Sequence, residues 1–242
     1  MCLIVVAVAA SARYPLLVAA NRDEQHVRPT QAAAWWPDAP HVLGGRDLSA
    51  GGTWLAVDDR GRFAAVTNIR DAQRPLGLRS RGSLVADYLG GSESAARYAA
   101  LASRDGPGFG AFNLLLFDGS ELHFASNRSP AVRLDNGLHA FSNAPPGTEW
   151  PKTASALRGA EPLLAQAAPI EPLFALLAER DETGAPERRY ERAHFVVGPT
   201  YGTRCSTVVL VGADGGVTFA ERSFDTAGLP AGEVRESFTL DR

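Results

Sequence analysis

The sequence has 242 residues, of which 45% are hydrophobic and 21% charged, with a net charge of −3. This composition is ordinary for a globular protein with a large core, and its acidic balance argues against nucleic-acid binding. No run reaches the roughly 18 apolar residues of a membrane span, and 2 cysteines provide neither a disulfide framework nor a zinc pattern. We therefore expect a cytoplasmic protein.

Hydrophobic patterning predicts alternating groups of strands and helices along the chain. Strands are expected at 2–9, 15–20, 53–58, 62–67, 111–117, 121–126, 138–142, 193–198, 204–211 and 216–222. Helices are expected at 82–103, 151–158 and 170–180. This segregation favours antiparallel sheets with helices on their outer faces. We find no convincing linker, so a single domain over residues 1–242 is expected.

Short polar segments indicate where these elements end. Gly90-Gly91-Ser92 should divide the stretch 82–103 into two helices, with Ser92 as the N-cap of the second. Pro172 suits the first turn of the last helix. The region 181–190 is expected to be charged and flexible.

Cys2 follows the initiator methionine and begins the first apolar strand. Removal of Met1 would give Cys2 a free α-amine, whose pKa near ~7.7–8.0 suits a general base for its own thiol. The thiolate is the reactive form, and a nearby cation favours it. The alternative is a small apolar residue that only starts a strand. The other cysteine, Cys205, is expected to be a core residue in an apolar strand.

Other polar residues gather at predicted strand ends. Arg22 can favour a thiolate and Asp23 can hold an ammonium, although both can equally form local ion pairs worth ~0–1 kcal/mol. Asn68 and Asn143 carry amide hydrogens suited to an oxyanion, an effect of roughly 2.7–4 kcal/mol per donor, but each alone is more often a turn residue. Arg204 begins an apolar strand as either a site residue or a strand-edge cap.

Several motifs occur in a fixed order from one end of the sequence to the other. They are MCLI (1–4), ANRDE (20–24), RPT (28–30), WW (35–36), GGRDLSAGGTWLAV (44–57), GRFAAVTNIR (61–70), SRGSLVADYL (80–89), FNLLLFDG (112–119), SNAPPGTEWPK (142–152) and YGTRCSTVVLV (201–211). Together they resemble the NRDE family, also called the Transport and Golgi organisation 2 family. Cys205 departs from that pattern, which usually has serine there.

The resemblance implies an α+β fold, the four-layer αββα sandwich of two antiparallel sheets flanked by helices found in N-terminal nucleophile hydrolases. It also implies chemistry like that of penicillin V acylases and bile salt hydrolases, with Cys2 cutting an amide C–N bond of a small-molecule amide or acyl substrate. The catalytic candidates are Cys2, Arg22, Asp23, Asn68, Asn143 and Arg204, and the substrate-binding candidates are Asn21, Glu24, Trp54 and Trp150.

A second hypothesis keeps this scaffold without catalysis. The protein would then bind or carry haem or an acyl ligand, with Cys2 or a histidine as axial ligand and arginines paired with propionates.

The composition also indicates the source of the protein, because its basic residues are 23 arginines and the single lysine Lys152. This bias, with abundant Ala and Gly, is typical of a GC-rich bacterial genome.

Overall fold

The computed structural model describes residues 2–69, 79–104, 108–167, 169–181, 183 and 186–240. The chain divides into two compact units. Unit 1 comprises Met1–Val27, Asn136–Ser142 and Glu149–Thr239, and unit 2 comprises Arg28–Asp135, Asn143–Thr148 and Leu240–Arg242. The single domain expected over residues 1–242 stays a prediction.

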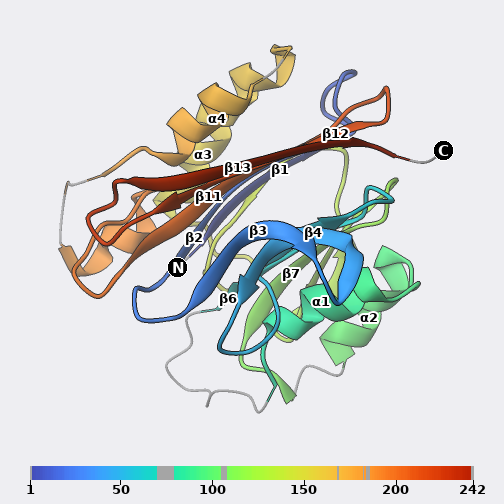
Figure 1. Ribbon diagram of the computed structural model, residues 1–242, viewed down its shortest axis with the longest axis horizontal. Coiled ribbons are helices and arrows are strands. Elements are labelled where there is room, and N and C mark those ends of the chain that lie inside the picture. Colours follow the sequence, from blue (N-terminus) through green and yellow to red (C-terminus); the bar gives the residue numbers. More distant parts are fainter. Residues whose placement is uncertain are drawn as a thin grey trace. The chain divides into compact units, whose positions relative to one another are not determined.

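Unit 1 is built on an antiparallel sheet with the strand order β10-β1-β2-β11-β12-β13. Its strands are β1 (Leu3–Val8), β2 (Leu16–Gln25), β10 (Gly137–Phe141), β11 (Tyr201–Val211), β12 (Gly216–Phe224) and β13 (Pro230–Thr239). Its helices are α3 (Pro151–Ala160), η2 (Glu161–Ala165), α4 (Ile170–Leu177) and η3 (Pro186–Glu191). Helices α3 and α4 cover one face of the sheet (Figure 1), because alternate apolar residues of β1, β2 and β11 pack against them.

Unit 2 is built on a second antiparallel sheet, with the strand order β3-β4-β5-β6-β7-β8-β9. Its strands are β3 (Thr30–Trp36), β4 (Ala39–Asp47), β5 (Leu55–Asp58), β6 (Phe63–Asn68), β7 (Phe112–Phe117), β8 (Leu122–Ser126) and β9 (Ser129–Arg133). Helices α1 (Gly82–Gly90) and α2 (Ala95–Arg104) pack on one face of this sheet (Figure 1). The buried Tyr88 of α1 belongs to the core between them and the sheet.

Most predicted elements are confirmed. The first hairpin pairs Leu3–Val8 with β2, and the second turns at Gly61, whose φ of +79° suits glycine. The helical stretch breaks after Gly90 as expected, but Ser92 is not the cap, because the Arg97 backbone N–H bonds the Ser94 hydroxyl. The expected strands at 111–117, 121–126, 138–142, 204–211 and 216–222 and the helices at 151–158 and 170–180 are also present.

One prediction near residue 190 needs correction. The expected strand at 193–198 is wrong, because β2 pairs with β11 from Tyr201 onward. The 193–198 backbone instead bonds to loops, as in Phe195 N–H to the Glu179 carbonyl. Within the region 181–190, expected to be flexible, η3 begins at Pro186; positions 182, 184 and 185 lie outside the described residues.

The sequence patterns do not reveal strands β3, β4, β9 and β13. Strand β4 contains Gly44 and Gly45, and glycine is depleted in strands. A Cβ on Gly45 would lie 2.2 Å from the ring of Trp54, so close packing explains that glycine. Strands β9 and β13 lie at sheet edges and are largely exposed, so they show no buried apolar run.

Candidate active site

The register of β1, β2 and β11 determines what surrounds Cys2. Leu3 pairs with Asn21, so Cys2 lies beside the polar end of β2. Successive side chains of a strand point to opposite faces, and Asn21 and Asp23 therefore share the face covered by α3 and α4, whereas Arg22 lies on the other face. Cys2 is partly exposed, and its charge influences groups on both faces.

Asn21 connects strand β2 to the helices of unit 1. Its Nδ2 donates hydrogen bonds to the carbonyls of Leu177 and His194, each at 2.8 Å, and its Oδ1 accepts from the Ser206 hydroxyl at 2.5 Å. Asn21 is only 1% exposed. Asn21 is a predicted substrate-binding residue, and in the structure its amide fixes the end of β2 against α4.

Lys152 is the functional candidate that sequence reasoning missed. It lies in the first turn of α3, whose N-cap is Trp150, and its side chain is completely buried. Its Nζ has no hydrogen-bond partner among the described residues. Burial lowers the pKa of Lys152, while the negative charges of Asp23 and Cys2 act to raise it. A signal was present in the sequence, because Lys152 is the one lysine in a chain that otherwise uses arginine.

Asp23 and His194 hold the surroundings of Lys152 in place. Asp23 is 5% exposed, and its Oδ1 accepts a hydrogen bond of 2.7 Å from the Thr203 hydroxyl. His194 is buried, with its Nδ1 2.9 Å from the Leu176 carbonyl and its Nε2 3.2 Å from the Lys152 carbonyl. The imidazole thus joins the end of α4 to the first turn of α3.

The opposite face of the sheet carries a different group of polar side chains. Arg22 is 5% exposed and pairs across the ladder with Cys205, which is a free, buried thiol as expected. Burial and then the Glu221 carboxylate raise the pKa of Cys205 well above its usual value, and Arg22 acts in the other direction. The Arg22 guanidinium also lies 3.9 Å from Glu24, which is partly exposed.

Arg204 occupies a β-bulge. The β2–β11 register shifts between Thr203 and Cys205, so Arg204 is the extra residue. Its Nη1 donates hydrogen bonds of 3.1 Å to the carbonyls of Gln25 and His26. The structure therefore directs Arg204 toward the end of β2, and its catalytic role stays a prediction.

The two asparagines proposed as oxyanion donors meet inside unit 2. The Asn143 side chain is buried, and its Nδ2 donates a 2.6 Å hydrogen bond to the carbonyl of Asn68, whose own side chain is exposed at the end of β6. A third amide, that of Asn113 on β7, donates to the carbonyl of Ala144 at 3.0 Å. Asn113 was not among the sequence-based candidates, since it lies within an apolar strand.

The two tryptophan candidates lie in different units. Trp54 of unit 2 is partly buried and packs against Gly45. Trp150 of unit 1 contacts Tyr190 edge-on at 5.5 Å between ring centroids, and its ring centroid lies 5.7 Å from the Lys152 Nζ. Trp150 therefore belongs to the surroundings of Lys152.

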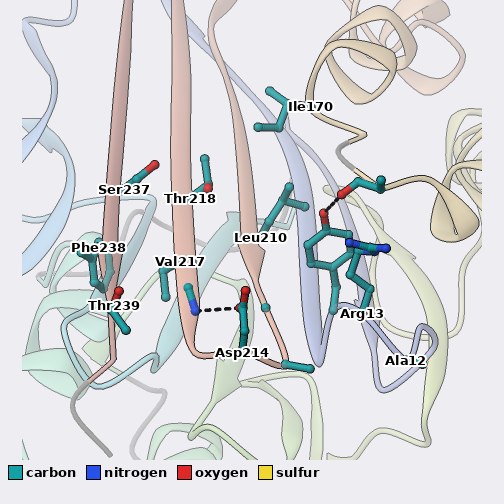
Figure 2. Close-up of a pocket in the computed structure, with 15 residues that line it drawn as sticks. Ala12, Arg13, Ile170, Leu210, Asp214, Val217, Thr218, Ser237, Phe238 and Thr239 are labelled. Carbon is teal, nitrogen blue, oxygen red and sulfur yellow. Dashed lines mark hydrogen bonds between the residues drawn. The ribbon is translucent and has the colours of Figure 1, made fainter.

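A separate pocket lies in unit 1, at the end of β1 remote from Cys2 (Figure 2). Its volume is about 860 Å³, and it is formed by the β1–β2 turn, the β11–β12 turn, the end of β13 and the start of α4. Leu210, Ile170 and Thr218 line its floor and wall, and the charged groups that line it are Arg13 and Asp214. None of the sequence-based candidates lines this pocket.

Comparison with solved structures gives the fold class. An N-acylethanolamine-hydrolyzing acid amidase ortholog from Caenorhabditis elegans matches with a TM-score of 0.55 at 12% identity, over 86% of this chain and 92% of that chain. The C2A mutant of the conjugated bile acid hydrolase from Clostridium perfringens matches with a TM-score of 0.54 at 9% identity, over 99% of this chain and 92% of that chain. The predicted α+β fold of two antiparallel sheets with helices is thereby confirmed as a likeness of fold to these two hydrolases.

The sequence relatives specify the family. The model of the Transport and Golgi organisation 2 family matches residues 1–226. The Transport and Golgi organization protein 2 homologs of Bos taurus and Homo sapiens are 37% and 34% identical, over 87% and 94% of this chain and 87% and 93% of those proteins. The chain belongs to this family, as its motifs predicted. In the part of the chain that the structure describes, no helix combines the length and apolar character needed to cross a membrane.

Proposed function

We propose that this protein hydrolyses the C–N bond of small-molecule amides, with Cys2 as the nucleophile after removal of Met1. The observation that carries the proposal is the position of Cys2, which directly precedes β1 and lies beside the polar end of β2. The fold likeness supports it, since one structural neighbour is named for hydrolysing N-acylethanolamines, which are amides. The other is a bile acid hydrolase altered at Cys2.

The proposed reaction has two stages. The Cys2 thiolate attacks the acyl carbonyl, and the C–N bond breaks as the α-ammonium of Cys2 gives a proton to the leaving amine. Water then hydrolyses the thioester and restores the thiol. Within unit 1, Arg22 is proposed to favour the thiolate and Asp23 to hold positive charge. The oxyanion roles of Asn68 and Asn143 stay predictions from the sequence. Arg204 remains a candidate for the second cation of the site and Glu24 for substrate contact, and the substrate-binding role of Trp54 stays a prediction from the sequence.

The cellular location is part of the same proposal. Cys2 and Cys205 are both free thiols, and reduced thiols fit the cytoplasm. The Cys2 thiol must be free to attack a substrate, and it would be protected from oxidation in that compartment.

Activity on amides with Cys2 variants tests the proposal. Intact mass should show loss of Met1, and a panel of N-acylethanolamides and N-acyl amino acids should include a substrate. Cys2→Ala should reduce turnover by about 10⁴-fold or more, and Cys2→Ser should also cripple it while the fold is retained. Full activity of Cys2→Ala would contradict the assignment of the nucleophile.

A second candidate function is carriage of an acyl ligand, and the pocket of about 860 Å³ favours it. The pocket combines an apolar floor with Arg13, which can pair with a carboxylate. Its lining contains no His, Cys or Met, and the Tyr14 hydroxyl already donates to the Ala167 carbonyl (Figure 2). These residues do not fit a haem iron, so a fatty acid is the better test ligand. Thr218→Trp should fill the pocket and abolish binding of a fluorescent fatty acid, whereas Cys2→Ala should leave it unchanged.

A further inference from the structure

Strand β13 forms one edge of the unit 1 sheet (Figure 1). It pairs with β12 along its whole length, from Pro230 opposite Phe224 to Thr239 opposite Gly216. Among the described residues, no strand pairs with its other side. The free side of an edge strand presents backbone N–H and C=O groups that can pair with a further strand. Every residue of β13 is exposed or half-buried, so this edge is accessible.

The other three edges of the two sheets have features that discourage such pairing, in the part of the chain that the structure describes. Strands β9 and β10 contain five residues each, and Pro130 of β9 lacks a backbone N–H. The ladder of β3 shifts its register twice, and such bulges interrupt pairing. Strand β13 contains ten residues, with proline only at its first position, Pro230. The register shift in its own ladder lies at that same end, beside Phe224.

The charged residues of β13 belong to a network of ion pairs on the face that α4 covers. The Arg222 guanidinium lies over the Phe174 ring of α4, and its Nε donates to the Glu233 carboxylate at 2.6 Å. The Nη2 of Arg235 donates to Glu171 at 3.0 Å and to Glu233 at 3.1 Å. The Glu233 and Arg235 side chains are still 37% and 46% exposed, so both can interact with a strand placed against this edge.

The order of these charges matches a second copy of the same strand. In an antiparallel pair with its two-fold axis at Val234, Glu233 lies opposite Arg235 of the other copy, and symmetry repeats this pair. Moving the axis to Glu233 or to Arg235 would instead place two like charges opposite each other, which is unfavourable. With the axis at Val234, the half-buried Val234 lies opposite its own copy and Phe238 lies opposite Pro230. The charges therefore favour one register of one partner.

We propose that two copies of this chain associate through β13, which joins their six-stranded sheets into one antiparallel sheet across a two-fold axis at Val234. Main-chain hydrogen bonds would hold the two strands together, and the charged pairs would select the partner. Each Glu233 keeps its Arg222 hydrogen bond and gains Arg235 of the other copy. Two paired strands make a small interface, so we expect a dissociation constant of about 1–100 μM.

Disulfide formation tests the register. The background is Cys2→Ala with Cys205→Ser, which contains no other cysteine. Residues directly opposite in an antiparallel pair have Cα atoms about 4.5–5.5 Å apart, within the range of about 4.4–6.8 Å that a disulfide allows. Val234→Cys should therefore form a covalent dimer under mild oxidation. Ser237→Cys is the matched control, because Ser237 lies opposite Ala231 and about 20 Å along the strand from its own copy. Its covalent dimer should form at least about tenfold more slowly.

Charge exchange tests the same contact without cysteines. Arg235→Glu and Glu233→Arg should each weaken dimerisation by at least about tenfold in sedimentation velocity, because each places like charges opposite one another twice. An equimolar mixture of the two variants should dimerise again, since one chain then carries two carboxylates and the other two guanidiniums. Mixing cannot restore ion pairs lost within a chain, so this recovery excludes a purely intramolecular effect. Arg158→Glu, at an exposed position of α3, should dimerise like the parent.

The parent protein should sediment with a mass approaching twice the 25.7 kDa of one chain as its concentration rises. A parent that stays monomeric up to about 100 μM, the weak end of the expected range, would overturn the proposal and leave a strand of a different protein as the occupant of this edge. A dimer that is indifferent to both charge variants, or that cross-links faster through Ser237→Cys than through Val234→Cys, would overturn β13 as the contact. The proposal does not depend on the hydrolysis of amides, and neither result decides the other.

Discussion

Asp23 of strand β2 and Lys152 of helix α3 are both buried inside unit 1, with side chains 5% and 0% exposed, and the Asp23 carboxylate acts to raise the pKa of Lys152. The two residues are 129 positions apart in the sequence (152 − 23). The hydrogen bond from Asn21 to the His194 carbonyl and the contact of His194 with the Lys152 carbonyl help to hold β2 beside α3. Removing the Asp23 carboxylate would leave the buried Lys152 without this opposing charge, whereas removing the cation leaves Asp23 with its Thr203 hydrogen bond.

The pH dependence of stability should report the buried lysine. Burial lowers the pKa of Lys152 below 10.5 in the folded chain, so between the folded value and 10.5 the unfolded chain binds more protons and stability rises with pH. Below that window both states are protonated and the cost of burial is fully present. Lys152→Met should therefore be more stable than the parent at low pH, with a gain that shrinks as the pH approaches 10.5. Urea denaturation at about pH 6 and about pH 10 measures this gain.

Arg158→Met is the matched control for that measurement, because Arg158 is an exposed cation of the same helix. Its stability relative to the parent should not depend on pH in this way. A Lys152→Met protein that loses stability at low pH would contradict this prediction. It would show that the Lys152 ammonium is stabilised by further interactions beyond the charges of Asp23 and Cys2.

Replacement of Asn21 should destabilise unit 1 through lost hydrogen bonds. Asn21→Leu removes the donor to Leu177 and His194 and leaves both carbonyls buried without it. Each buried polar group left unsatisfied costs about 1–3 kcal/mol, so the free energy of unfolding should fall by about 3–5 kcal/mol. Urea denaturation provides the measurement, and Asn136→Leu, at an exposed position, should change it little.

Cys205 should be unreactive in the folded protein. Burial raises the pKa of its thiol, so very little thiolate forms at neutral pH. Iodoacetamide should label Cys2 in the native protein and Cys205 only on unfolding, and peptide mass distinguishes the two sites. Rapid labelling of Cys205 under native conditions would mean that the sheet opens between β11 and its neighbours. Cys205→Ser, which keeps a hydroxyl beside Glu221, should preserve the fold.

The sequence predicted the candidate site only in part. Apolar runs located β1, β2 and β11, and their polar ends led to Cys2, Arg22 and Asp23. The same runs could not show that Arg22 and Asp23 project to opposite faces, because that follows from the register with Leu3 and Cys205. Lys152 was overlooked because a single lysine after a proline resembles an exposed helix start.

The fold was predictable wherever one face of an element is buried. Strand β7 is buried throughout and was found, whereas β13 alternates exposed residues at a sheet edge and was not. The segment 193–198 resembles a strand in sequence because His194 and Phe195 are apolar or buried, although neither pairs in a ladder. Burial alone therefore does not distinguish a strand from a packed loop.

Arg62 should prove essential to unit 2. Its Nε donates to the Asp58 carboxylate at 2.7 Å, and its Nη atoms donate to the carbonyls of Leu89 and Gly91 at the end of α1, at 2.7 and 2.9 Å. Arg62 is 7% exposed and Asp58 is 0% exposed, so Arg62→Met leaves a buried carboxylate uncompensated and the helix carbonyls without a donor. The free energy of unfolding should fall by about 3–5 kcal/mol. Arg60→Met, which removes an exposed cation from the same turn, should cost less than about 0.5 kcal/mol. Equal losses in the two variants would show that net charge, rather than the buried pair, supports α1.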